Sequence, residues 1–255
     1  MTVNTKKKSK ASYFAGRCIK EIARDILSAI FCIAFPVIML FTFAAINHFS
    51  SGMTPMFELA TLTPSICCFS YTFVMLFMAL LVSKDRSTSL LSRLYVSPLS
   101  SADYLIGYAA AGMLIALLQT AVCFMCGCLV ALFIGADYLS IGGIALCFVT
   151  LLPTVLFYIA LGMIFGSLFS DKAAPGICSI IISGGSMLSG AWMPLEQMGE
   201  FEAFCRLLPF YPAVTVARQT AALILDQKFL VSLLTTALYA VAAAIIAPVA
   251  FKRKR

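Results

Sequence analysis

The sequence predicts an all-α integral membrane protein, and three observations lead to that fold class. Hydrophobic residues make up 62% of the 255 residues and charged residues only 11%, against about 45–50% and about 25% in soluble domains. The mean hydropathy is +1.00. The remaining observation is a set of long apolar stretches without charges. A soluble core of this length does not bury so much apolar surface, which excludes both a soluble globular protein and a disordered chain.

Six apolar stretches are long enough to cross a bilayer, for which a helix needs about 20 residues. None of them contains Lys, Arg, Asp or Glu, and such continuous runs favour helices over the alternating strands of a membrane barrel. Pro36, Pro64 and Pro153 lie within these stretches and are expected to kink the helices. The predicted spans are residues 26–47, 60–82, 104–134, 139–169, 173–191 and 229–250.

Residues 1–25 form a basic amino-terminal segment. Ile19, Ile22, Ala23 and Ile26 follow helical spacing, which predicts an amphipathic helix lying in the cytoplasmic membrane interface. The alternative is a charged lead-in to the first span. The run of lysines between residues 6 and 10 is interpreted as a topology signal, so no nucleic-acid partner is expected.

The basic residues also set the orientation of the chain. Fifteen of the 18 Lys and Arg residues fall before the first span, in the loops after the second and fourth spans, or in the tail 251–255. The alternate segments hold only Arg206, Arg218 and Lys228. Because basic residues stay on the cytoplasmic side, we predict six crossings with both termini cytoplasmic and residues 192–228 outside.

No catalytic, cofactor or metal site is expected. Most of the ten cysteines lie in apolar runs, so they are interpreted as buried packing residues rather than disulfides. Cys123 and Cys126 share a helix face, but a zinc site needs about four ligands and the single histidine, His48, lies elsewhere. The closest carboxylates, Glu196, Glu200 and Glu202, are interpreted as a solvated acidic rim. No Gly-rich phosphate loop is present, so the chain is not expected to hydrolyse ATP itself.

The spans also lack the ionisable groups that proton- and ion-driven transporters place inside the membrane. Coupling through hydroxyls or backbone carbonyls stays open. If transport is active, the energy is expected from outside the chain. Gly162 and Gly166 form a GxxxG pair that predicts close helix packing, without deciding between packing inside the chain and dimerisation.

Residues 83–103 connect the second and third spans and predict a short cytoplasmic helix. Ser87, Thr88 or Ser89 is a candidate cap, Leu90, Leu91 and Leu94 give an apolar face, and Pro98 ends the helix. A helix held between two membrane helices acts as a lever on both. The alternative is an interfacial helix without a partner.

Two segments resemble the permease subunits of type-2 ABC exporters. In the connection between the second and third spans, the matching residues are Asp85, Arg86, Arg93, Leu94, Pro98, Leu99 and Ser100, followed by Tyr104 and Gly107. Asp85 replaces the more typical Glu, and Ser89 stands where Gly is common. Nearer the carboxyl terminus, the matching residues are Leu188-Ser189-Gly190, Met193-Pro194, Leu208-Pro209 and Pro212. The resemblance covers essentially the whole chain.

The resemblance implies a subunit that pairs with a second permease, as a homodimer or heterodimer, each seated on a separate cytoplasmic ABC ATPase in the cell membrane. A coupling helix would dock into the ATPase through Asp85, Arg86, Leu91, Arg93, Leu94 and Pro98, with Asp85 and Arg93 pairing with ATPase charges. An outer segment with Gly190, Pro194, Pro209 and Pro212 would form short helices that re-enter the membrane. The expected function is export of a lipophilic drug, lipid or peptide.

Two alternatives stay open. One is an ion-coupled secondary transporter or channel that acts without an ATPase. The other is a non-transporting membrane scaffold or a protein resembling bacteriocin-immunity proteins.

Overall fold

The computed structural model describes residues 10–25, 30–49, 55–88 and 101–253, and these form helices without a strand. The all-α prediction is therefore confirmed for the described residues. In chain order the elements are α1 (Lys10–Arg24), the π-helix η1 (Ile30–Ala34), α3 (Phe35–Phe49), the 3-10 helix η2 (Pro55–Phe57), α4 (Leu59–Ser87), α6 (Ser101–Ile134), α7 (Ile141–Thr150), α8 (Leu152–Leu168), α9 (Ala174–Leu188), the 3-10 helix η3 (Leu195–Gln197), α10 (Glu200–Leu207), α11 (Phe210–Ala221) and α12 (Gln227–Arg253).

Within the described residues, five helical segments are long and apolar enough to cross a membrane: Ile30–Phe49, Leu59–Ser87, Asp103–Ile134, Ile141–Leu168 and Gln227–Phe251. They correspond to five of the six predicted spans. The sixth predicted span, at 173–191, contains α9, which has only 15 residues. A helix of this length is about 22 Å long, whereas the hydrocarbon core of a bilayer is about 30 Å thick. Gly190, with φ of 70°, follows the end of α9 in a conformation that favours glycine. The count of six crossings stays a prediction.

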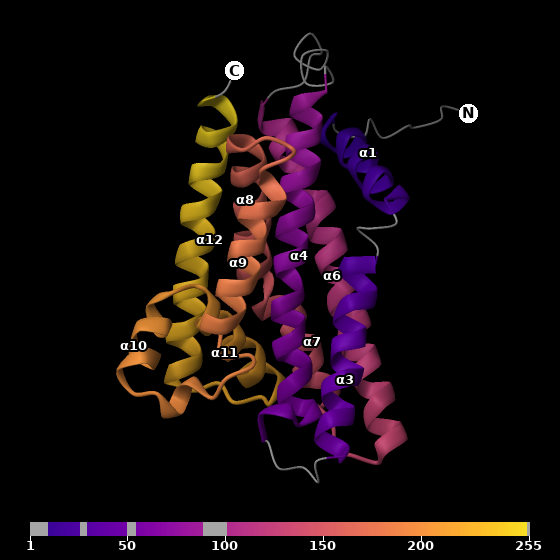
Figure 1. Ribbon diagram of the computed structural model, residues 1–255, viewed down its shortest axis with the longest axis vertical. Coiled ribbons are helices and arrows are strands. Elements are labelled where there is room, and N and C mark those ends of the chain that lie inside the picture. The colour runs from indigo at the N-terminus through magenta and orange to yellow at the C-terminus, as the bar shows by residue number, and fades with distance from the viewer. Residues whose placement is uncertain (1–9, 26–29, 50–54, 89–100, 254–255) are drawn as a thin grey trace, which may run out of the picture.

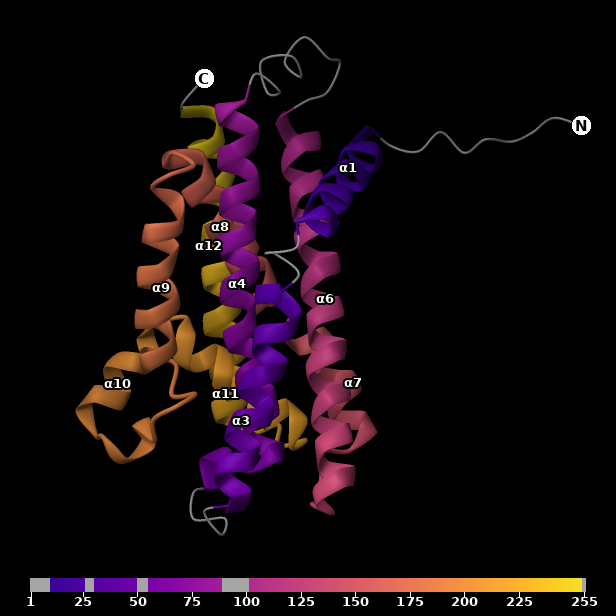
Figure 2. The same ribbon diagram turned by 45° about the vertical axis from the view of Figure 1, so that its right-hand side comes forward.

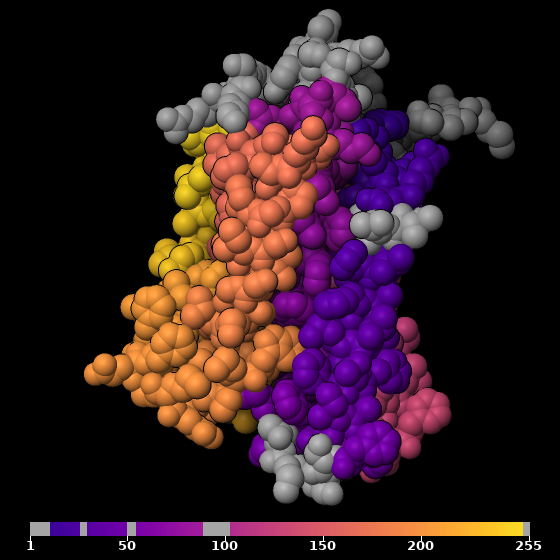
Figure 3. All heavy atoms as spheres, in the orientation of Figure 1, coloured from indigo at the N-terminus to yellow at the C-terminus, as the bar shows by residue number. Residues whose placement is uncertain are grey.

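Helix α4 is the central element of the bundle (Figures 1 and 2). In the most apolar 18-residue part of α4, 83% of the residues are buried inside the chain. In the corresponding part of α12, the share is 28%. Helices α6, α8, α9 and α11 all pack on α4, and Figure 3 shows α9 and α3 covering much of it on one face. Its position lets a displacement of one end of α4 reach most of the bundle.

Gly162 and Gly166 lie where α8 approaches α4. A Cβ atom on Gly162 would collide with the backbone oxygen of Met75, and one on Gly166 would lie 2.8 Å from the Cβ of Val82. The GxxxG pair therefore permits close packing of two helices of the same chain.

The prolines interrupt the helices to different degrees. Pro36 has no N–H to donate to the carbonyl of Cys32, four residues earlier, and a π-helix ends two residues before it. The Gln119 side chain of α6 donates to that carbonyl with an N–O distance of 2.5 Å. Pro153 lies in the first turn of α8, where the helix breaks after α7. Pro64 lies inside α4, which continues as one helix.

The two ends of the bundle differ. Helix α1, the last turns of α12, the end of α4 and the start of α6 lie at one end, whereas α10 and α11 lie toward the other (Figure 1). Helix α1 and the last turns of α12 therefore lie at the same end of the bundle, and that the two termini share one side of the membrane stays a prediction. That this side is cytoplasmic stays a prediction from the basic residues.

Candidate functional site

The candidate site is a polar junction where α1, α4 and α6 meet, with Asp85 at its centre. Asp85 is in the last turn of α4 and only 1% exposed. Arg17 of α1 donates two hydrogen bonds to its two carboxylate oxygens, at 2.8 and 2.7 Å. The Tyr108 hydroxyl of α6 donates a third, at 2.6 Å. One buried carboxylate therefore joins three helices in the paired, hydrogen-bonded state that burial of a charge requires.

Apolar contacts hold α1 in the position that Arg17 needs. The Phe14 ring packs edge-on against Tyr104 and Tyr108, with ring centroids 5.1 and 4.9 Å apart. Gly107 lies directly beneath Phe14, because a Cβ there would lie 2.5 Å from a ring carbon. The Cys18 thiol is fully buried in the same contact, and burial raises its pKa to about 12, so it stays a neutral packing group.

This contact corrects the predicted apolar face of the amino-terminal helix. Its buried residues are Ala11, Phe14, Ala15 and Cys18, all of which precede the predicted set. Ile19 and Ile22 are only half-buried at its edge, Ala23 is exposed, and Ile26 lies outside the described residues. The prediction placed the helix in the cytoplasmic membrane interface, and in the structure α1 packs Phe14 and its small neighbours on α6.

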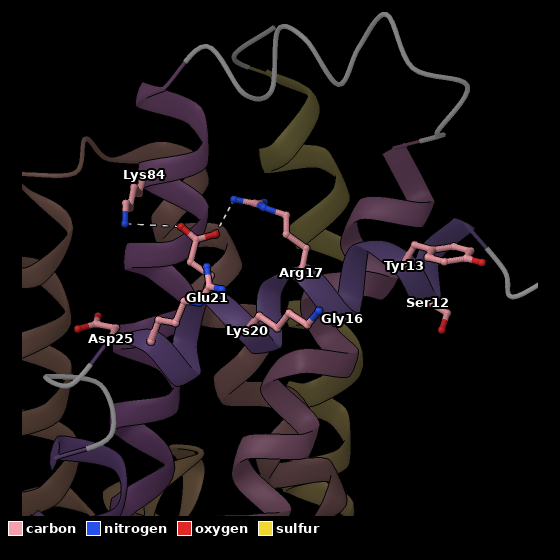
Figure 4. A pocket seen from close by; sticks show the side chains of 9 residues that line it. Ser12, Tyr13, Gly16, Arg17, Lys20, Glu21, Asp25 and Lys84 are labelled. Atoms are coloured by element: carbon pink, nitrogen blue, oxygen red, sulfur yellow. Dashed lines mark hydrogen bonds and ion pairs between the residues drawn. The ribbon is translucent and has the colours of Figure 1, made fainter.

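A second layer of charges surrounds the buried pair on the solvent side. Arg17 also pairs with Glu21, whose other oxygen lies 3.5 Å from the Lys84 nitrogen of α4, and Figure 4 shows both cations approaching this carboxylate from different helices. The hydrogen bonds with Asp85 raise the pKa of Arg17 against the opposing effect of burial. These groups line a hollow of about 930 Å³ between α1 and the end of α4, and its wall is strongly charged.

The structure describes only part of the predicted coupling residues. Asp85 and the half-buried Arg86 belong to α4, which continues to Ser87. Leu91, Arg93, Leu94 and Pro98 lie outside the described residues. Asp85 was expected to pair with a charge of the ATPase, but its carboxylate points into the chain and is occupied by Arg17 and Tyr108.

The residues predicted for the outer segment lie between α9 and α12. Gly190 makes the turn after α9, and Pro194 directly precedes η3. Pro209 precedes α11, and Pro212 is buried in the first turn of that helix. Helix α11 packs on α4, α7, α9 and α12, so this part of the segment lies within the bundle. That the segment re-enters the membrane stays a prediction.

Two of the three carboxylates interpreted as an acidic rim have separate cationic partners. Glu196 lies 3.0 Å from the Lys228 nitrogen. Glu202 accepts from Arg206 at 2.8 Å and from the Tyr211 hydroxyl at 2.7 Å. Across the described ranges, no group of three or more His, Cys, Asp and Glu side chains is placed to hold a metal ion. All ten cysteines carry free thiols.

Long apolar helices with exposed apolar side chains, such as Leu234, Leu238 and Ile245 on α12, define a multi-pass α-helical membrane protein. The model of the ABC-2 type transporter family matches residues 12–222, from the first turns of α1 to just past α11. The chain belongs to this family, whose members are the membrane permease components of ABC transporters and normally work with an ATPase subunit. Among curated proteins, none matches the chain.

Proposed function

We propose that the chain is the permease subunit of an ATP-driven exporter, and that residues 83–103 receive the force of a separate cytoplasmic ATPase. The exporter contains two permease subunits, each above one ATPase, and moves a lipophilic drug, lipid or peptide through a path that the spans form. The observation that carries the proposal is the buried Asp85 junction at the base of this connection.

The junction explains how a push on the connection reaches the spans. Residues 89–100 are joined on one side to α4 and on the other to α6. Asp85 fixes the same end of α4 to α1 through Arg17 and to α6 through Tyr108. A force on the connection therefore moves three helices as one unit, since none of them shifts alone without exposing a buried carboxylate or leaving it unpaired.

The force continues into the bundle through α4. This helix is unbroken over 29 residues, and α8 contacts its backbone at Gly162 and Gly166. Because no compressible side chain lies between the two helices at these glycines, movement of α4 displaces α8 directly. The predicted spans contain no Lys, Arg, Asp or Glu that could couple transport to an ion gradient. This supports an external ATPase as the source of energy.

The proposal is tested by charge reversal and polar substitution in the connection. We expect Arg93→Glu and Leu94→Asp to leave membrane insertion intact but to abolish capture of a stoichiometric ATPase from host membranes, together with ATP-driven transport into inverted vesicles. Arg206→Gln, at the other end of the bundle, is the control and retains both. Stable ATPase association with unchanged transport in both connection variants contradicts the docking assignment.

The same preparation separates the proposal from a secondary transporter. The purified chain, reconstituted alone with an imposed proton or sodium gradient, is expected to accumulate no solute. Uphill accumulation under these conditions overturns the need for an ATPase.

A further inference from the structure

A cavity of about 650 Å³ lies at the end of the bundle opposite α1, between η2, the end of α9, η3, α11 and the start of α12. Trp192, Phe57 and Met193 supply apolar parts of its wall, and Arg218, Lys228 and Glu196 supply charges. The junction at Asp85 does not use it. An apolar wall beside charged groups is typical of a site for an amphipathic ligand.

Arg218 is held in a fixed orientation at this cavity. Its Nε donates to the Ser65 hydroxyl of α4 at 2.7 Å, and Nη2 donates to the Ala191 carbonyl at 3.4 Å. A guanidinium has five N–H donors, so most of them are left for another acceptor. The two tethers come from separate elements, which orients the planar group before any ligand arrives.

The positive charge of Arg218 has no carboxylate partner. All eleven acidic residues of the chain fall within the described ranges, and among those residues none forms an ion pair with Arg218. Glu196 is the acidic residue of the cavity wall, and it pairs with Lys228 at 3.0 Å. The cavity wall therefore carries two cations and one carboxylate, and Glu196, which also acts on Arg218 through space, forms its ion pair with Lys228. Arg218 is a half-buried cation without an ion pair of its own, where a carboxylate normally accompanies such a group.

We propose that this cavity is a binding site for a phosphate group carried by an amphipathic molecule, with Arg218 as the phosphate ligand. A phosphate offers several acceptor oxygens in the geometry that the fork of a guanidinium matches. Trp192 and its apolar neighbours receive the adjoining hydrocarbon, which favours a lipid headgroup over free phosphate. The site is independent of the proposed ATPase coupling, because it lies at the other end of the bundle.

The cavity contains its own reporter, because Trp192 is the only tryptophan of the chain. The full-length protein in detergent is titrated with dihexanoyl phosphatidic acid, with dihexanoylglycerol, which lacks the phosphate, and with inorganic phosphate, which lacks the chains. We expect dihexanoyl phosphatidic acid to change Trp192 fluorescence saturably, and the other two probes to bind at least tenfold more weakly. Equal affinity for inorganic phosphate supports the anion site but assigns it to free phosphate; equal affinity for dihexanoylglycerol overturns the proposal.

Variants of Arg218 test the assigned ligand. Arg218→Gln is expected to weaken binding of dihexanoyl phosphatidic acid by at least tenfold, since a charge-assisted pair is lost. Arg206→Gln, an exposed arginine outside the cavity wall, is the matched control and binds within twofold of the wild type. If Arg218→Gln does not fold, Arg218→Lys retains the charge without the fork and is expected to bind several-fold more weakly. Wild-type affinity in a folded Arg218 variant contradicts the proposal.

Discussion

The Arg17–Asp85 pair is the contact on which force transmission depends most, and Arg17→Gln removes one half of it. Removing one partner of a fully buried ion pair costs about 3–5 kcal/mol, whereas an exposed pair is worth about 0–1 kcal/mol. The Asp85 side chain is 2% exposed and that of Arg17 is 34% exposed, so the pair lies between these limits. Because Tyr108 still donates to Asp85, we expect α1 to be held about 2 kcal/mol less tightly.

Cys18 provides the assay, since its thiol is fully buried against the junction and becomes reactive only when α1 separates. When α1 closes faster than the reagent reacts, labelling follows the population of the open state. A loss of about 2 kcal/mol raises that population about 30-fold. Alkylation followed by peptide mass spectrometry therefore reports a Cys18 rate about 30-fold higher in Arg17→Gln. The rate for Cys205, buried at the other end of the bundle, is the internal control.

The double variant Arg17→Gln with Asp85→Asn distinguishes charge from packing. Without the carboxylate, no unpaired charge stays buried, so more than half of the loss is expected to be recovered. Labelling of Cys18 at the wild-type rate in Arg17→Gln, or simply additive effects of the two substitutions, would refute the reasoning.

Two further predictions concern packing and pH. Gly162→Ala places a Cβ against the Met75 carbonyl and is expected to destabilise the bundle by about 1–3 kcal/mol. Gly176→Ala, where nothing lies within 4 Å, is the matched control in thermal unfolding and is expected to change little; equal midpoints contradict the α4–α8 contact. Hydrogen bonds from Tyr211 and then Arg206 lower the pKa of Glu202. The stability that Glu202 contributes to the α10–α11 contact is therefore present above the unfolded pKa near 4.3 and is lost as pH falls through the lower folded pKa. As the pH falls through that value, hydrogen exchange in α10 should rise in the wild type but stay constant in Glu202→Gln.

The fold class and the approximate position of the spans follow from the sequence alone, because each depends on local composition. Long runs without charged residues predict the helices, and Pro153 predicts a kink in the span that α7 and α8 form. The length of α9 did not follow, since the apolar run 173–191 continues past the residue where the chain turns. Only the left-handed backbone at Gly190 ends the helix there.

The candidate site was only partly predictable. Asp85 was identified from its place in a motif, but its role was assigned to a partner protein. Arg17 lies 68 positions earlier in the sequence, and no periodicity links residues so far apart. The spacing of Ala11, Phe14, Ala15 and Cys18 was the available signal that the first turns of α1 pack on another helix. It is a weak signal because Phe14 is the one large apolar residue in it, and the two alanines carry little hydropathy.

What the sequence determined by itself is where the chain is apolar, where it is basic and which side chains it lacks. These properties add up along the chain, so they are fixed before folding. The tertiary structure decided which charges are compensated: it gives Asp85 an arginine and leaves Arg218 without a carboxylate. Charges interact over a few ångströms through space, and only helix packing sets those distances.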